Sequence, residues 1–370
     1  MNIKSLLLGS AAAIVAVTGA RAADAVVIAE PEPMDYVRIC DVYGTGFYYI
    51  PGTETCLKIG GYVRLDVRGG DFGAVAETDI LDRDEGDFDD TYDIRSRLTL
   101  RLDARSETEL GTLRAFGQIE FNYNTFEGVD AAGNDVALAG NSTSLNQAYI
   151  ELGGFRAGKT DSLFTTWTGY AGSVILDDVN VAYGPFDTHQ IAYTFTGANG
   201  FSASIAVEDG DGGNFQLDSY VPDVVGGLAY TQGWGGISVV AGYDSVTEEG
   251  AIKGRLDINA TEQLSLFVLA GWSTNDSSVG GVDVNAPNNF YGAWSGDYVI
   301  FGGGSFKATE KATINAQVAY DEDENFSAGI NVDYQLVPGF TITPELVYVD
   351  NFDVDDSDGF GGMVRFQRNF

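Results

Sequence analysis

The sequence predicts an all-β protein, namely a transmembrane up-and-down antiparallel β-barrel of 16 strands. Three features of the chain lead to this prediction. Apolar and polar side chains alternate with a period of two over most of its length. The connections between the alternating stretches are short and long in turn. Beyond the N-terminal region, no uninterrupted apolar run approaches the roughly 18 residues that indicate a membrane-spanning helix.

Residues 1–22 are predicted to be a secretory signal peptide. Lys4 supplies a positive charge, an apolar run extends from Leu6 to Val17, and Ala20-Arg21-Ala22 offers a small-residue cleavage site. The apolar run is too short for a transmembrane helix, which needs about 20 residues. We therefore expect an exported protein.

The composition excludes several classes of function. With 54 Asp and Glu against 20 Lys and Arg, the formal net charge is −34, so a nucleic-acid partner would be repelled. The single histidine, His189, leaves no His-rich metal site and no visible set of nucleophile, base and acid. We therefore predict that the protein is not an enzyme and that it uses neither a cofactor nor a metal.

Two cysteines, Cys40 and Cys56, precede the first alternating stretch. A single pair in an exported chain predicts a structural disulfide, and the absence of a C-x-x-C motif makes redox catalysis the weaker interpretation. We expect residues 23–56 to form a periplasmic N-terminal segment that contains this disulfide. The barrel is expected to occupy residues 57–370.

The first strand shows the alternation most clearly. Between residues 57 and 68, odd positions such as Leu57 and Val63 are apolar or small, whereas even positions such as Arg64 are mostly charged. Successive side chains of a strand point to opposite faces, so the segment has one apolar and one charged face. The same reading gives strands at 57–68, 92–104, 111–123, 144–153, 155–161, 188–196, 200–208, 223–232, 236–244, 250–260, 264–273, 297–307, 311–321, 326–336, 340–350 and 359–370.

The connections favour a closed barrel over a soluble β-sandwich. Short connections fall at 106–110, 153–154, 197–199, 233–235, 260–263, 308–310 and 337–339. The longer ones fall at 69–91, 124–143, 162–187, 209–222, 245–249, 274–296, 322–325 and 351–358. A sandwich would bury both inner faces, but here charged residues occupy the polar face of strand after strand. Closure removes the sheet edges, which lipid does not tolerate.

The last strand is amphipathic and ends in an aromatic residue. Val364, Phe366 and Phe370 share one of its faces. This ending resembles the assembly signal of bacterial outer-membrane barrels, so Phe370 is predicted to serve as that signal. The same resemblance predicts that the protein is located in the cell outer membrane.

Several segments resemble the general porins of alphaproteobacteria, of the Brucella and Rhizobium type. The similar segments are residues 37–44 and 49–64 around the cysteines, 155–164, 183–186 and 364–370. The resemblance implies a homotrimer of 16-stranded barrels that passes small hydrophilic solutes and ions passively. Outer-membrane lipid and lipopolysaccharide would surround it. The acidic segments 69–92 and 321–324 depart from the family, which leaves the ion preference open.

The connection 162–187 is the candidate constriction of the pore. It is rich in apolar residues, unlike the other long connections, so we expect it to pack on protein. The resemblance identifies it as a long third loop folded into the lumen; a trimer-contact position outside the barrel is the alternative. Its acids, Asp177 and Asp178, would then face a basic wall, which is made by Arg64, Arg68, Arg95, Arg97 and Arg101.

Three alternatives stay open at this point. The arginines could pair locally with Asp66, Asp93 and Asp103, with or without a field across the pore. The acidic run 79–90 could bind calcium, although it lacks the EF-hand spacing and is better explained as a solvated loop. The barrel could also be a solute-specific channel, for example for sugars, or a structural or adhesive barrel. With both signs of charge present, we predict weak cation selectivity.

Overall fold

The computed structural model describes residues 38–71, 78–81, 88–129, 135–210, 215–274, 278–279, 282–283 and 289–370. The predicted signal peptide lies outside the described residues. Residues Ile39–Phe370 form one compact unit, to which the following description applies. Within the described residues, no helix is both long and apolar enough to span a bilayer.

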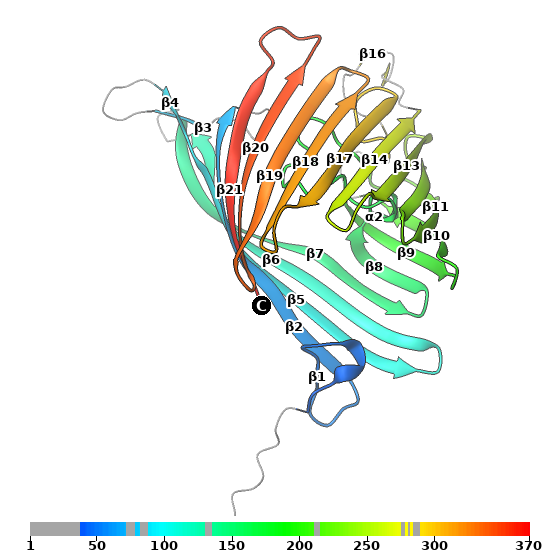
Figure 1. Cartoon of the computed structure of the whole chain (residues 1–370). Helices are drawn as coiled ribbons and strands as arrows, with labels where there is room; N and C mark the ends of the chain where they lie inside the picture. The colour runs from blue at the N-terminus through cyan, green and yellow to red at the C-terminus, as the bar shows by residue number, and fades with distance from the viewer. Residues whose placement is uncertain are drawn as a thin grey trace, which may run out of the picture. The chain divides into compact units, whose positions relative to one another are not determined.

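Sixteen strands of the described residues form one closed antiparallel ring (Figure 1). They are β2 (Cys56–Asp71), β5 (Asp93–Thr108), β6 (Gly111–Val129), β7 (Asp135–Leu152), β8 (Phe155–Asp161), β9 (Asp187–Thr196), β10 (Phe201–Asp209), β11 (Asp223–Gln232), β12 (Gly235–Asp244), β13 (Glu249–Asn259), β14 (Leu264–Ser273), β17 (Tyr298–Lys307), β18 (Ala312–Asp321), β19 (Asn325–Val337), β20 (Phe340–Asn351) and β21 (Gly359–Asn369). Each pairs with the one before it, and β2 pairs with both β5 and β21. Every predicted strand is confirmed.

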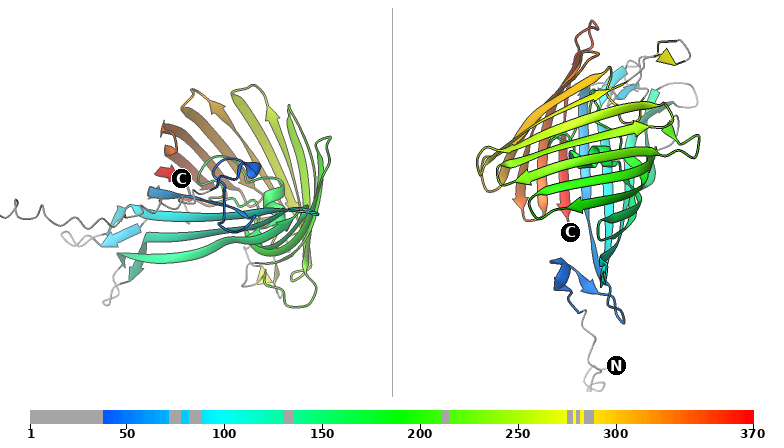
Figure 2. Two further views of the ribbon diagram at one scale, coloured as in Figure 1. Left: turned by 90° about the horizontal axis from the view of Figure 1, so that it is seen from below. Right: turned by 90° about the vertical axis from the view of Figure 1, so that its right-hand side faces the viewer.

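The ring closes where the first strand meets the last (Figure 2). The pairing of β2 with β21 runs from Tyr62 opposite Asn369 to Asp71 opposite Phe360. One further residue extends the pairing. The Phe370 amide donates to the Gly61 carbonyl at 3.0 Å, and the Gly61 amide donates to the Phe370 carbonyl at 3.1 Å. Gly61 has a φ of 153°, and a Cβ there would lie 1.9 Å from the Thr99 carbonyl oxygen. Thr99 belongs to β5, so the close approach of β5 on the other side of β2 leaves room only for glycine at this position.

Exposure of the side chains confirms the two-faced pattern. Val63 is 54% exposed and its neighbour Tyr62 only 5%; Val268 is 52% exposed and Leu269 is fully buried. Apolar residues exposed along strand after strand would be unfavourable in water, and they form the outward face expected of a barrel in lipid. The opposite face carries the charged residues.

One predicted connection is wrong. The sequence pattern predicts a long loop over residues 124–143, but β6 continues to Val129 and β7 begins at Asp135. Antiparallel pairing uses backbone hydrogen bonds, so it continues to Val129 opposite Asp135 although the side chains there do not show a clear alternation. Two smaller hairpins, β3 (Thr78–Leu81) with β4 (Phe88–Thr91) and β15 (Ser278–Val279) with β16 (Val282–Asp283), lie in other long connections.

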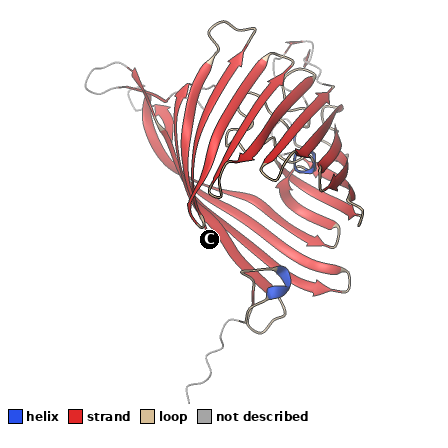
Figure 3. Cartoon of the chain, in the orientation of Figure 1, coloured by secondary structure: helices blue, strands red, loops and turns tan. Residues whose placement is uncertain are grey.

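The N-terminal segment is attached to the short-turn end of the ring. The predicted disulfide between Cys40 and Cys56 is present, with a Cα–Cα distance of 6.0 Å. It encloses the 3₁₀ turn η1 (Asp41–Tyr43) and the strand β1 (Tyr48–Tyr49), which pairs with the start of β2 (Figure 3). Both cysteines and Phe47 are buried together. The Arg105 guanidinium lies 5.1 Å from the Phe47 ring centroid.

Replacing both cysteines with serine is expected to lower the free energy of unfolding by about 3 kcal/mol, as the chain-entropy model gives for a loop of this size. Urea unfolding of the refolded barrel, compared with and without the double substitution, measures this change. Thiol labelling of the chain without these substitutions, after unfolding in the absence of a reductant, should find no free cysteine. Two reactive thiols per chain would contradict the disulfide.

Candidate functional site

The five predicted arginines lie together on the polar face of β2 and β5. The strand register places Arg64 opposite Arg97. It also places Arg68 opposite Asp93, and Asp66 opposite Arg95. Residues opposite one another on neighbouring strands share a face. Arg101 lies opposite Gly60 on the same face. The structure therefore brings Arg64, Arg68, Arg95, Arg97 and Arg101 into one basic patch.

Three of these arginines pair locally with acids. Arg68 pairs with Asp93, and Arg95 pairs with Asp66 at 2.7 Å. Asp66 is fully buried and also pairs with Arg365 of β21 at 2.7 Å. Arg97 pairs with Glu120 of β6 at 2.7 Å. Local pairing, which the sequence left open, thus offsets much of the charge of the patch.

Arg64 and Arg101 differ from the other three. Within the described residues, neither forms an ion pair; Arg64 Nε donates to Gln367 at 2.9 Å and Arg101 Nε to Gln118 at 2.7 Å. Both guanidinium groups lie against the Tyr62 ring, at 4.4 Å and 5.5 Å from its centroid. Neither guanidinium group is therefore neutralised by a direct ion pair, unlike those of the other three arginines.

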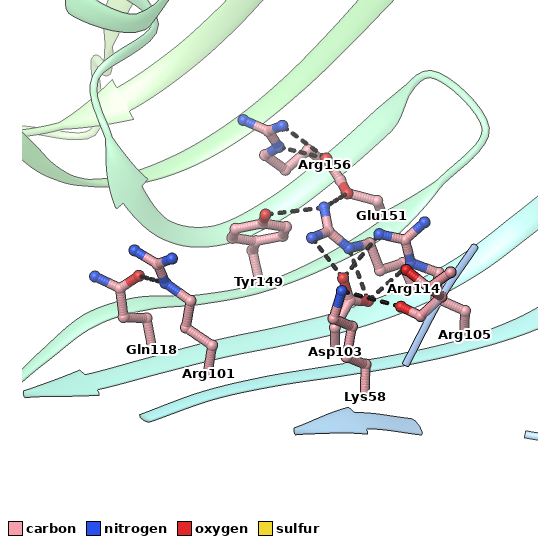
Figure 4. Close-up of polar contacts among 10 residues, drawn as sticks. Lys58, Arg101, Asp103, Arg105, Arg114, Gln118, Tyr149, Glu151 and Arg156 are labelled. Carbon is pink, nitrogen blue, oxygen red and sulfur yellow. Dashed lines mark hydrogen bonds and ion pairs between the residues drawn. The ribbon is translucent and has the colours of Figure 1, made fainter. Parts of the chain in front are cut away.

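A second group of ion pairs continues the patch toward the short turns (Figure 4). Asp103 pairs with Arg105 and Arg114, at 2.7 Å and 2.9 Å, and Glu151 pairs with Arg114 and Arg156, at 2.8 Å and 2.7 Å. Sequence reasoning did not select Arg105, Arg156 or Arg365. Their position on the charged face of alternating strands was the signal that could have identified them.

Residues 162–187 connect β8 to β9 and pack on protein, as predicted. The segment begins with α2 (Leu163–Trp167), whose N-cap is Ser162. Glu208 of β10 accepts hydrogen bonds from Ser162 Oγ and the Leu163 amide, both at 2.7 Å. Further along, Phe164 and Tyr183 are buried at 0% and 2% exposure. The apolar residues of the segment thus belong to a core.

Polar side chains of distant strands hold the rest of the segment. Lys253 of β13, which is fully buried, donates to the Tyr183 carbonyl at 2.6 Å. Gln317 of β18 donates to the Asp177 carbonyl at 2.7 Å. Glu345 of β20 accepts from the amides of Ile175 and Leu176. Within the described chain, no hydrogen bond joins residues 162–187 to β2, β5, β6 or β7.

The two predicted acids lie near the middle of this segment. Asp177 accepts a hydrogen bond from the Tyr183 hydroxyl at 3.0 Å. Enclosure by protein, followed by the charge of Asp178, raises the pKa of Asp177 to about 7, against the lowering effect of that hydrogen bond. In the described residues, neither Asp177 nor Asp178 forms an ion pair with an arginine. The side chains of the acidic run 79–90 lie outside the described residues.

Comparisons with known proteins agree with the architecture. The family model described as Porin subfamily matches residues 24–364. Porin Omp2b of Brucella neotomae is 49% identical over the full length of both chains, and Porin Omp2b of Brucella suis biovar 1 is 48% identical over the same extent.

Two solved structures share the fold. The outer membrane channel DcaP of Acinetobacter baumannii covers 87% of this chain and 99% of its own, with a TM-score of 0.62 and 16% identity. A triple mutant of Rhodopseudomonas blastica porin covers 85% of this chain and all of its own, with a TM-score of 0.54 and 15% identity. The closed 16-strand ring, the family match and the full-length identity lead to one conclusion: the chain belongs to the porin subfamily and forms an outer-membrane porin channel.

Proposed function

We propose that the barrel is a passive, water-filled channel for small hydrophilic solutes and ions, and that residues 162–187 cross its lumen and narrow it. One observation carries this proposal. The segment leaves the wall after β8 yet contacts β10, β13, β18 and β20, strands that are distributed around much of the closed ring. A ring of this size is wide enough for a water-filled interior, so a crossing segment would set the aperture.

The open side of this aperture would be the basic patch. The segment makes its hydrogen bonds to strands other than β2, β5, β6 and β7 in the described chain, which leaves their polar face free to line the passage. Asp177 and Asp178 would supply negative charge from the segment, and Arg64 and Arg101 would supply positive charge from the wall. Opposed charges of this kind produce a transverse field and contribute to selectivity.

Planar-bilayer recording of the purified full-length protein tests the channel. We expect ohmic steps of current in potassium chloride, and entry of neutral monosaccharides into liposomes that contain the protein. Intact barrels without conductance would support a structural or adhesive role instead. Saturable block by one sugar but not by its isomers would support a solute-specific channel.

We also propose that the barrel assembles as a homotrimer in contact with outer-membrane lipid and lipopolysaccharide. Around the seam, the exterior carries small and aliphatic residues such as Gly362, Val63 and Val364, which permit close approach of a second barrel. Mass measurement after mild detergent extraction should give three chains per particle. A purely monomeric particle would contradict this assembly.

A further inference from the structure

Tyr62 is buried between two arginine side chains on the polar face of the ring. The Arg64 guanidinium carbon lies 4.4 Å from the centroid of the Tyr62 ring, and that of Arg101 lies 5.5 Å away. In the strand register, Tyr62 pairs with Thr99, whereas Arg101 pairs with Gly60 and Arg64 pairs with Arg97. The two arginines therefore approach the ring from different strands and from opposite directions along them.

The position of each guanidinium group is fixed by two contacts. The aromatic ring supports one face through a cation–π contact, and an amide oxygen receives the Nε–H, from Gln367 for Arg64 and from Gln118 for Arg101. Tyr62 is itself held, since its hydroxyl donates to Glu120 at 3.2 Å. Such support lowers the conformational entropy that each arginine loses when it binds a ligand.

The nearby acids are already engaged by other arginines. Glu120 pairs with Arg97, Asp66 with Arg95 and Arg365, and Asp103 with Arg105 and Arg114. In the part of the chain that the structure describes, the Nη nitrogens of Arg64 and Arg101 donate to no protein acceptor. The patch thus contains two guanidinium groups in contact with one tyrosine ring, and the terminal nitrogens of both form no hydrogen bond with the described protein.

We infer that Arg64 and Arg101, held against Tyr62, form a binding subsite for the carboxylate or phosphate group of a solute in transit. The planar, bidentate donor set of arginine matches the oxygens of both groups. Tyr62 acts as a positioning residue, because its buried ring orients the two guanidinium groups. The subsite rests on the proposed open channel, and it deepens that proposal by naming the class of solute that the channel retains briefly.

Current block by tripolyphosphate tests this subsite. Added to one side of a bilayer in dilute potassium chloride, tripolyphosphate is expected to reduce the open-channel current in a saturable manner. In the double variant Arg64→Gln, Arg101→Gln, the half-blocking concentration should increase about tenfold or more. A tenfold loss of affinity corresponds to the loss of a single charge-assisted hydrogen bond. Citrate, the carboxylate probe, should respond in the same direction, and glucose should not block either channel.

The matched controls are single charge removals inside and outside the subsite. Arg68→Gln removes the same charge as Arg101→Gln, but Arg68 is already paired with Asp93. Arg101→Gln should raise the half-blocking concentration severalfold, whereas Arg68→Gln should change it less than about twofold. Arg101→Lys should restore only part of the block, since lysine keeps the charge without the bidentate geometry.

The possible results separate the subsite from the channel. Equal effects of Arg68→Gln and Arg101→Gln would overturn the subsite in favour of a general surface potential. Normal conductance without saturable block by either anion would also overturn it while leaving the channel intact. An absence of conductance in the native protein would instead reject the proposed channel.

Discussion

Neutralising Asp177 and Asp178 together, as Asp177→Asn and Asp178→Asn, is expected to lower the ratio of potassium to chloride permeability at every salt concentration. Neither acid has an arginine partner in the described residues, so their charge would act on ions in the aperture. One unit charge about 8 Å away in water contributes about 0.5 kcal/mol, or roughly a twofold change in local cation concentration. The reversal potential across a potassium chloride gradient measures the ratio.

Neutralising the acidic run 79–90 serves as the spatial control for this experiment. The screening length is about 8 Å at 0.15 M salt and about 30 Å at 0.01 M. Charge that is distant from the aperture should therefore affect selectivity mainly at low salt, whereas Asp177 and Asp178 should act at both. Anion preference of the native channel at low salt would show that Arg64 and Arg101 outweigh the acids.

Cation preference should also fall when the pH is lowered through about 7. The pKa of Asp177 is raised to about 7, so this carboxyl is mostly ionised at pH 8 and mostly neutral at pH 6. Loss of negative charge from the aperture reduces attraction for potassium. The same titration in the Asp177→Asn variant should lack this step; a step that persists there would assign it to another group.

Replacing Glu345 with alanine is expected to detach the middle of residues 162–187 from the wall. Glu345 is 2% exposed and accepts from the Ile175 and Leu176 amides and from Asn331 Nδ2, the last at 2.8 Å. A buried donor left without an acceptor costs about 1–3 kcal/mol. A loss of about 2 kcal/mol increases the population of the detached state roughly 30-fold. Open-channel current noise and entry of disaccharides into liposomes should both increase.

Thr343→Ala is the matched control for Glu345→Ala. Thr343 lies on the same strand and the same face, and its hydroxyl donates to Asp333 at 2.7 Å rather than to the segment. This variant should keep native noise and sugar entry. Glu345→Gln retains one acceptor oxygen and should fall between the two. Native behaviour of a correctly folded Glu345→Ala barrel would contradict the role of this contact.

Much of the fold could be predicted because each strand contains its own pattern. The alternation around Val63 or Ile330 depends only on adjacent residues, and lipid on one face of the barrel enforces it. The pairing of Arg68 with Asp93 and of Arg95 with Asp66 could be anticipated for the same reason, since neighbouring strands share a register. The true ends of β6 and β7 could not be predicted, because their backbone pairing continues where the side chains no longer alternate clearly.

The anchors of residues 162–187 could not be predicted from the sequence. The alternation along each strand places Glu345 and Lys253 on the polar face, but it does not reveal which backbone groups these side chains bind. Glu345 binds amides that are 170 and 169 residues away in the chain, and Lys253 binds a carbonyl 70 residues away. Contacts of this kind depend on the curvature of the closed ring, which no local pattern encodes.

The seam between β2 and β21 constrains the order in which the barrel can fold. Arg64 and Gln367, which share a hydrogen bond across it, are separated by 303 residues. One edge of β2 therefore remains unpaired until almost the whole barrel has been synthesised. An unpaired edge is costly in lipid and prone to pairing with other chains in water. We therefore expect the strands to insert as a nearly complete sheet after translation, with closure of the seam as a late, slow step.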